Sequence, residues 1–317
     1  MRSRARAATR IRGARSKPHE LQREVHRARA ESRSEFAFEL DAPRARDYTG
    51  SMTKDLYTHG HHDSVLRSHR WRTVDNSAAY LRPHLAPAQR LLDVGCGPAT
   101  LTVDLARHVP NGRVVAIDRA EAVLGEARAA VAASGMPIEV AAGDVYALQF
   151  AAAAFDVVHA HQVLQHLSEP VRALREMRRV CAPEGLVAAR DSDYGSFRWY
   201  PEDPRLDAWL RLYHRVAESN QAYPDAGRRL LEWARAAGFR EVTISASVWC
   251  FATPESRSWW SDLWAERITE SAMAEQALSR GFATRAELAS MAEAFRAWGA
   301  SHDGYWTLTH GELLARP

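Results

Sequence analysis

The segment from Leu91 to Thr100, with the sequence LLDVGCGPAT, restricts the possible folds more than any other part of this chain. An apolar strand that contains Asp93 leads into a turn with Gly95 and Gly97, and residues 101–108 then have the pattern of a helix. Glycine lets the backbone bend sharply and approach a ligand without a Cβ in the way. The helix N-terminus after such a turn offers unpaired N–H groups to an anion. The segment therefore predicts a strand, a turn and a helix that bind a carboxylate or phosphate.

A second apolar strand that ends in an acid, Arg113–Asp118, follows the glycines. In doubly wound α/β folds, a carboxylate about 20 residues after the glycine turn binds the hydroxyls of a ribose. The dinucleotide fingerprint G-x-G-x-x-G/A would place its third small residue at Thr100, whereas the small residue here is Ala99. The spacing therefore disfavours a Rossmann-type oxidoreductase, which we keep as the alternative.

Motifs further along the chain complete a pattern that resembles the class I S-adenosylmethionine (SAM) methyltransferases of the UbiE/COQ5 or type 11 group. The resemblance extends from Leu91 to Ala189 and is weaker beyond. After the glycine turn it rests on three segments, Gly143-Asp144-Val145, Phe155–Leu167 and Arg179–Gly185. Three positions depart from the family's pattern: Ala99 replaces a third glycine, Glu184 replaces another glycine, and Ala151–Ala154 replace a Pro-rich loop.

The resemblance implies a SAM site around the glycine turn. Gly95 and Gly97 would let the methionine moiety and the ribose approach closely, and Cys96 between them is small enough for the turn. Asp93 would orient the ammonium group, directly or through water. Asp118 would bind the ribose hydroxyls.

Other residues are expected to complete this cofactor site. The resemblance implies that Arg119 flanks the adenine and that Asp144 and Val145 meet its amino group and face. The segment Tyr57–His62 contains three histidines, but no Cys or carboxylate cluster stands at ligand spacing, so we expect a lid over cofactor or substrate and no metal site. Arg72, like Arg70, is a candidate partner for the cofactor's carboxylate.

The acceptor side of the site is expected after the fourth and fifth strands, since open α/β sheets place their active crevices at the carboxyl ends of strands. His161 and Gln162 follow the fourth strand, and His161 is the leading candidate for a general base because imidazole titrates near neutral pH. Its alternative role is to position the cofactor through its backbone. His166 is a catalytic candidate or a structural residue at a helix start. Asp191 either reaches the acceptor or caps a loop.

Apolar runs of about five residues alternate with helical segments, which predicts an α/β fold with a parallel sheet covered on both faces. We expect a doubly wound, Rossmann-like, seven-stranded sheet within residues 90–317. The segments 242–249 and 305–314 would form its antiparallel end, and a helical cap would occupy residues 195–237 and 254–303. Residues 52–89 are expected to form a helical lid, with a helix over residues 64–81.

The positive charge of the chain is concentrated at its N-terminus. Residues 1–50 contain 13 basic and 7 acidic residues, whereas the remainder contains 29 basic and 32 acidic residues. We expect residues 1–51 to be a disordered basic extension, or sequence upstream of a start at Met52. A mitochondrial transit peptide and a nucleic-acid tether are the alternatives. The acidic balance of the remainder argues against a nucleic-acid partner.

These features together predict a methyltransferase that transfers the methyl group of SAM to carbon or oxygen of a small molecule, with nitrogen left open. Seven of the ten tryptophans lie between Trp199 and Trp264, which fits an aromatic or apolar acceptor. A non-catalytic SAM-binding protein is a further alternative. The three separated cysteines and the lack of an 18-residue apolar run predict a cytoplasmic protein without a membrane span. The sequence does not determine the oligomeric state, and a homodimer is one option.

Overall fold

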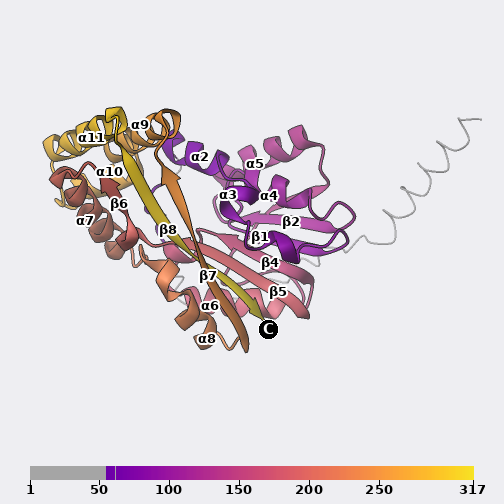
Figure 1. Ribbon diagram of the computed structural model, residues 1–317. Helices are drawn as coiled ribbons and strands as arrows, with labels where there is room; N and C mark the ends of the chain where they lie inside the picture. The colour runs from indigo at the N-terminus through magenta and orange to yellow at the C-terminus, as the bar shows by residue number, and fades with distance from the viewer. Residues whose placement is uncertain (1–54, 61) are drawn as a thin grey trace, which may run out of the picture. The chain divides into compact units, whose positions relative to one another are not determined.

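The computed structural model describes residues 55–60 and 62–317, so the expected N-terminal extension over residues 1–51 lies outside the described part of the chain. The described residues form one eight-stranded sheet in the order β3-β2-β1-β4-β5-β8-β6, and β7 also pairs with β8 (Figure 1). The sheet is parallel from β3 to β5 and antiparallel beyond. The α/β fold class is therefore confirmed.

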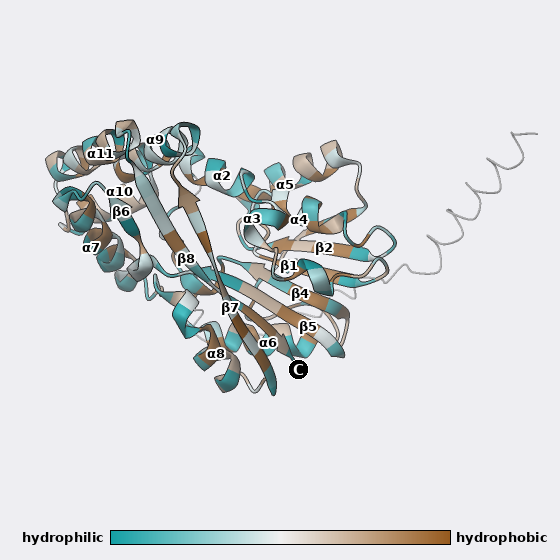
Figure 2. Ribbon diagram, in the orientation of Figure 1, coloured by the Kyte–Doolittle hydropathy of each residue, from teal (hydrophilic) through white to brown (hydrophobic). Residues whose placement is uncertain are grey.

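The parallel half of the sheet is largely buried, except at its edge, where β3 contains only half-buried and exposed residues. Its strands are β1 (Arg90–Val94), β2 (Arg113–Asp118), β3 (Ile138–Ala142), β4 (Phe155–His161) and β5 (Cys181–Ser192). The helices that connect them are α4 (Thr100–Ala106), α5 (Glu121–Ser134) and α6 (Pro170–Val180). Leu91 and Leu92 belong to different hydrophobic clusters because successive side chains point to opposite faces. Figure 2 shows the resulting apolar runs along β2, β4 and β5.

The strand β8 (Tyr305–Arg316) organises the antiparallel end. It pairs with β5 through Ser192↔His310 and the residues that follow, and with β7 (Glu241–Phe251) along nearly its whole length. Its first residues extend beyond β5 and pair with β6 (Arg198–Tyr200). The sheet thus has eight strands where we expected seven, because a three-residue strand is too short to show a period in the sequence.

A second hydrophobic core lies between the cap helices and the ends of β7 and β8 near Trp249 and Trp306. Its helices are α7 (Pro204–Ser219), α9 (Pro254–Glu270), α10 (Ala272–Ser279) and α11 (Arg285–Ala300). The helix α10 was not expected. The helix α8 (Leu230–Ala236) packs on the sheet through Trp233 instead, so the cap stops short of the expected residue 237.

The N-terminal segment forms two short helices, α2 (Asp63–Arg70) and α3 (Val74–Ser77), where we expected one helix. Thr73 starts a new helix by accepting from the backbone N–H of Asn76, while the Asn76 side chain caps Thr73 in return. The remaining short 3₁₀ helices are η1 (Arg82–His84), η2 (Leu164–His166), η3 (Tyr194–Ser196) and η4 (Ala226–Arg229). No helix of the described residues is long and apolar enough to cross a membrane.

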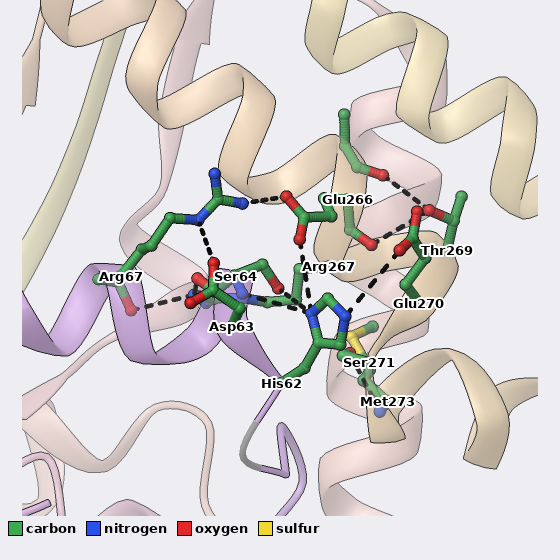
Figure 3. A network of polar contacts seen from close by, with 12 residues as sticks. His62, Asp63, Ser64, Arg67, Glu266, Arg267, Thr269, Glu270, Ser271 and Met273 are labelled. Atoms are coloured by element: carbon green, nitrogen blue, oxygen red, sulfur yellow. Dashed lines mark hydrogen bonds and ion pairs between the residues drawn. The ribbon is translucent and has the colours of Figure 1, made fainter. Parts of the chain in front are cut away.

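An ion-pair network joins α2 to α9 (Figure 3). Arg67 contacts Glu266, and His62 lies 3.7 Å from Glu266 and 3.9 Å from Glu270. These side chains are about one-third exposed or more. The network holds the N-terminal segment against the cap.

The turn after β1 is left-handed at three alternate residues. Gly95 has φ 69°, Gly97 has φ 55° and Ala99 has φ 59°. A Cβ on Gly95 would lie 2.4 Å from Cγ2 of Val163, so the loop after β4 closes directly onto this turn. Glycine is therefore required at position 95 for two reasons, the left-handed backbone conformation and the close approach of Val163.

Asp191 is fully buried below the carboxyl end of β5. Its Oδ1 accepts from the backbone N–H of Gln165 at 3.0 Å, and its Oδ2 has no hydrogen-bond partner among the described residues. Burial raises the pKa of Asp191 from about 3.8 to about 7. The carboxyl group thus supports η2, and we expect its buried ionised form to destabilise the protein.

We predict that Asp191→Asn stabilises the protein most at alkaline pH. Because the folded pKa is raised, stability from this group is lost as the pH rises from about 4 to about 7. Asparagine resembles the protonated acid, so the gain should reach about 4 kcal/mol at pH 8 and shrink at pH 5. Urea denaturation at both pH values measures it, with Asp303→Asn at an exposed turn as the control. An equal gain at both values would contradict the prediction.

We predict that Gly95→Ala destabilises the protein by roughly 2–4 kcal/mol, from left-handed strain and from the clash with Val163. Adding Val163→Ala should relieve the clash and so regain the stability lost to it, but it should leave the backbone strain. The effects of the two substitutions on stability should therefore be non-additive in a double-mutant cycle. Gly125→Ala in α5 is the control, since its Cβ meets nothing within 4 Å and alanine favours a helix. Strictly additive costs at residues 95 and 163 would refute this account.

Candidate active site

Two neighbouring cavities lie at the carboxyl ends of the parallel strands. The larger, of about 370 Å³, is lined by the ends of β1, β2 and β4 and by the N-terminal segment. The smaller, of about 30 Å³, lies between the N-terminal segment, η2 and the cap. Five residues line both cavities: Tyr57, His69, Arg72, Gln162 and His166. These five residues, the junction, mark where a group could pass from one cavity to the other.

The large cavity is lined by all of the residues that we expected to bind the cofactor except Arg70. They come from five separate segments of the chain and are Tyr57, Arg72, Asp93, Gly95, Cys96, Gly97, Asp118, Arg119, Asp144, Val145, His161 and Gln162. Arg70 is not among them, because it pairs at the surface with Asp63 at 3.1 Å and Glu126 at 2.9 Å.

Backbone amides hold Asp118 at the end of β2. Its Oδ2 accepts from Gly97 N–H at 3.0 Å and its Oδ1 from Ala120 N–H at 2.9 Å. The carboxylate is therefore fixed beside the glycine turn while each oxygen keeps a further lone pair. This geometry fits the expected binding of ribose hydroxyls.

Asp93 is engaged inside the protein. Its Oδ1 lies 2.7 Å from His159 Nδ1, and its Oδ2 accepts from the hydroxyl of Thr102. The side chain is almost fully buried and ties α4 to β4. Any contact with an ammonium group would therefore use the remaining lone pairs of Asp93 or a bridging water.

The other side of the large cavity is built by the loops after β2 and β3. Asp144 Oδ1 accepts from Tyr146 N–H at 2.9 Å, which orients the loop that carries Val145. Arg119 Nη1 lies 3.9 Å from Asp55 Oδ2, so a residue outside the expected site also lines this wall. Burial raises the pKa of Cys96, which keeps its thiol protonated and unreactive.

The environment of His161 does not support the expected role as a general base. Arg190 Nη1 donates to His161 Nε2 at 3.0 Å, which occupies the lone pair that would accept a proton. Burial and the nearby Arg72 and Arg190 lower the pKa of His161 well below its usual range. His161 lines the large cavity as a neutral side chain stacked 6.2 Å from Trp249.

Gln162 fixes the position of Arg72 at the junction. Its Oε1 accepts from Arg72 Nη2 at 2.5 Å, and its Nε2 lies 2.9 Å from His310 Nε2. Because guanidinium only donates, the amide orientation is determined and His310 must accept. The residue has φ 54°, which is unusual for a non-glycine residue and is held by these two contacts.

His166 is also oriented by its neighbours. Gln165 Oε1 accepts from Ser192, so Gln165 Nε2 donates to His166 Nε2 at 3.0 Å. Burial and Arg72 lower the pKa of His166 to about 3, so the imidazole is neutral. The ring of Tyr57 meets it edge-on at 4.7 Å. The third expected catalytic residue, Asp191, lines neither cavity.

Several residues of the small cavity were not expected from the sequence. They are Val65, Ser68, His69, Gln165, Arg267 and Leu308. Trp260, by contrast, was a candidate from the sequence, because the adjacent Trp259 and Trp260 cannot share one helix face, and Trp260 lines the cavity. Arg267 carried no such signal.

The glycine turn and the polar rim of the large cavity fit SAM. A Cβ on Gly97 would lie 3.4 Å from His69 Nδ1 and so narrow the cavity, and the Asp118 carboxylate stands beside the same turn. The expected Cys96, Gly97 and Asp118 therefore form a cradle that is open to a nucleoside.

Comparison with known proteins supports this fit. Residues 91–185 match the methyltransferase domain family. An uncharacterized methyltransferase of Schizosaccharomyces pombe is 32% identical, and the alignment covers 81% of this chain and 95% of that protein. Demethylmenaquinone methyltransferase of Renibacterium salmoninarum is 32% identical over 57% of this chain and 77% of that protein.

Among solved structures, a Haemonchus contortus N-methyltransferase in complex with phosphomonomethylethanolamine and S-adenosylhomocysteine is 15% identical, with a TM-score of 0.49. It covers 83% of this chain, which spans 54% of that one. The family match and the full-length relative give no support to an oxidoreductase. The chain belongs to the class I methyltransferases, and it is a SAM-dependent methyltransferase related to the UbiE group.

Proposed function

We propose that this enzyme methylates carbon or oxygen of a small-molecule acceptor, with nitrogen left open, and that transfer takes place at the junction. The observation that carries the proposal is that two cavities share Tyr57, His69, Arg72, Gln162 and His166. A cofactor in the large cavity and an acceptor that reaches into the small one would meet at these residues.

The geometry of the large cavity supports a set of cofactor roles that we propose for its residues. We assign the ribose hydroxyls to Asp118 and the adenine to Asp144, Val145 and Arg119. Arg72, at the junction, is assigned to the methionine carboxylate, since a guanidinium binds a carboxylate through paired hydrogen bonds. When bound, SAM supplies a methyl group that is activated by its sulfonium.

The residues of the junction are better suited to position an acceptor than to deprotonate it. Burial lowers the pKa of both His69 and His166, so these imidazoles are neutral and weakly basic. Methyl transfer is an in-line displacement, in which alignment of the reacting atoms provides much of the acceleration. Trp249, Trp260 and Trp264 line the small cavity, would exclude water, and fit the aromatic or apolar acceptor body that we propose.

The cellular setting is also a proposal. Cys96, Cys181 and Cys250 are free thiols, which fits the reducing conditions of the cytoplasm. We propose no nucleic-acid partner, and the state of assembly, with a homodimer as one option, is left to measurement.

We predict that SAM and S-adenosylhomocysteine bind the protein with affinities in the micromolar range and that Asp118→Ala weakens this binding by roughly 1.5–3 kcal/mol. The loss corresponds to hydrogen bonds between a charged carboxylate and ribose hydroxyls. Isothermal titration calorimetry measures it, and Asp303→Ala, whose side chain is 78% exposed, is the matched control.

Two results would contradict the assignment. Unchanged affinity in Asp118→Ala would remove the ribose role of this residue. Binding of NADPH in place of both sulfur nucleotides would overturn the proposed use of the large cavity. Tight SAM binding without S-adenosylhomocysteine formation in a broad acceptor screen would instead favour a non-catalytic role.

A further inference from the structure

The small cavity carries positive charge without a matching negative group. Its described lining contains two guanidinium groups, Arg72 and Arg267, and no aspartate or glutamate. Glu266 and Glu270, the acids nearest to Arg267 in the sequence, contact Arg67 and His62 in the network of Figure 3. The cavity is therefore cationic by composition.

The other polar side chains of the small cavity do not supply a counterion. Burial raises the pKa of Tyr57 to about 12 and also raises the pKa of Tyr194, so both phenols stay protonated. Burial lowers the pKa of His59, His69 and His166, so these imidazoles stay neutral. The two guanidinium groups thus set the charge of the cavity.

Arg267 is built into the cavity wall. It is 4% exposed, and its Nη2 donates to Ser64 O at 2.9 Å and Ser68 Oγ at 3.0 Å. Its guanidinium lies 4.5 Å from the ring centroid of Trp264, and its Nε has no hydrogen-bond partner among the described residues. Neutral oxygens of α2 therefore position this charge, and none of them compensates it.

A second buried arginine of the chain, unlike Arg267, has an acidic partner. Arg190 is fully buried, but its Nε lies 3.5 Å from Glu312, which supplies the opposite charge. Burying a charge without such a partner costs several kcal/mol. Because Arg267 lines a cavity, an anion that enters the cavity can supply the missing partner.

We infer that the acceptor carries an oxyanion, a carboxylate or a phosphate, which Arg267 binds in the small cavity. This inference rests on the proposed function and deepens it by naming the substrate class. The volume of about 30 Å³ accommodates a compact group of this kind and not a whole acceptor. The rest of the acceptor therefore extends toward the junction, where the small cavity adjoins the large one.

Arg267 is the residue that determines specificity for this group, whereas Arg72 has a second duty. Arg72 lines both cavities and is held by Gln162, so the methionine carboxylate can neutralise it. Arg267 lines only the small cavity. The bound oxyanion is thus a recognition group and lies on the acceptor side of the junction.

The test compares oxyanions with neutral molecules of the same shape. The full-length protein is saturated with S-adenosylhomocysteine and titrated at constant ionic strength with acetate, benzoate and inorganic phosphate, and with acetamide and benzamide. Tryptophan fluorescence reports binding, because Trp249, Trp260 and Trp264 line the cavity. Comparing the affinities for acetate and benzoate with the affinity for phosphate shows whether the cavity binds a carboxylate or a phosphate.

We expect at least one oxyanion to bind tenfold or more tightly than the amides. Arg267→Gln should lose at least tenfold in oxyanion affinity while its affinity for S-adenosylhomocysteine stays unchanged, and Arg267→Lys should keep part of the oxyanion affinity. Arg211→Gln, at an exposed position of α7, should behave as the wild type.

Failure of the inference and failure of the proposed function give different results. If the wild-type protein does not bind S-adenosylhomocysteine, the proposed function is contradicted. Normal binding of S-adenosylhomocysteine with equal affinities for benzoate and benzamide would overturn the inference, as would oxyanion binding that Arg267→Gln leaves unchanged. The wild-type comparison decides the question even if a variant does not fold.

Discussion

The strand β8 holds the two hydrophobic cores of this enzyme together. Leu313 and Ala315 pack in the core of the sheet, whereas Trp306 and Leu308 pack in the core of the cap. A rigid strand that is shared by both cores fixes the cap relative to the carboxyl ends of β1, β2 and β4. The small cavity is lined from both sides, by Leu308 of β8 and by residues of α9 and η2. The geometry of the small cavity therefore depends on the pairing of β8 with β5 and β7.

Burial has opposite consequences for the histidines and arginines of the site. It lowers the pKa of His166 to about 3, which removes its charge at neutral pH, and it lowers the pKa of Arg72 to about 10, which leaves that residue cationic. Burial thus makes the histidine neutral at physiological pH but leaves the arginine charged. The small cavity consequently has a positive charge that is constant over the physiological pH range and does not depend on a titrating imidazole.

The parts of the fold that the sequence predicts correctly are local. Apolar runs that end in Asp93 or Asp118, next to glycines, reveal the parallel strands and the cofactor turn without knowledge of any distant contact. The role of His161 was not predictable in this way, because the register of β4 against β5 places it beside Arg190, 29 residues away. Arg267 was missed for a similar reason, since only the packing of the cap brings α9 to the junction. The three residues of β6 were too few to form a pattern.

The arrangement of α9 separates two properties of the enzyme. Trp260, Trp264 and Arg267 occupy one stripe of this helix, spaced by four and three residues, and all three face the small cavity. The expected cofactor residues come from strands and loops of the sheet and from the N-terminal segment, and none comes from α9. If the small cavity binds the acceptor as proposed, a few substitutions along this stripe change which acceptor is admitted while the nucleotide site stays intact. The proposed arrangement would then let acceptor specificity change through a single helix, separately from the part of the chain that lines the large cavity.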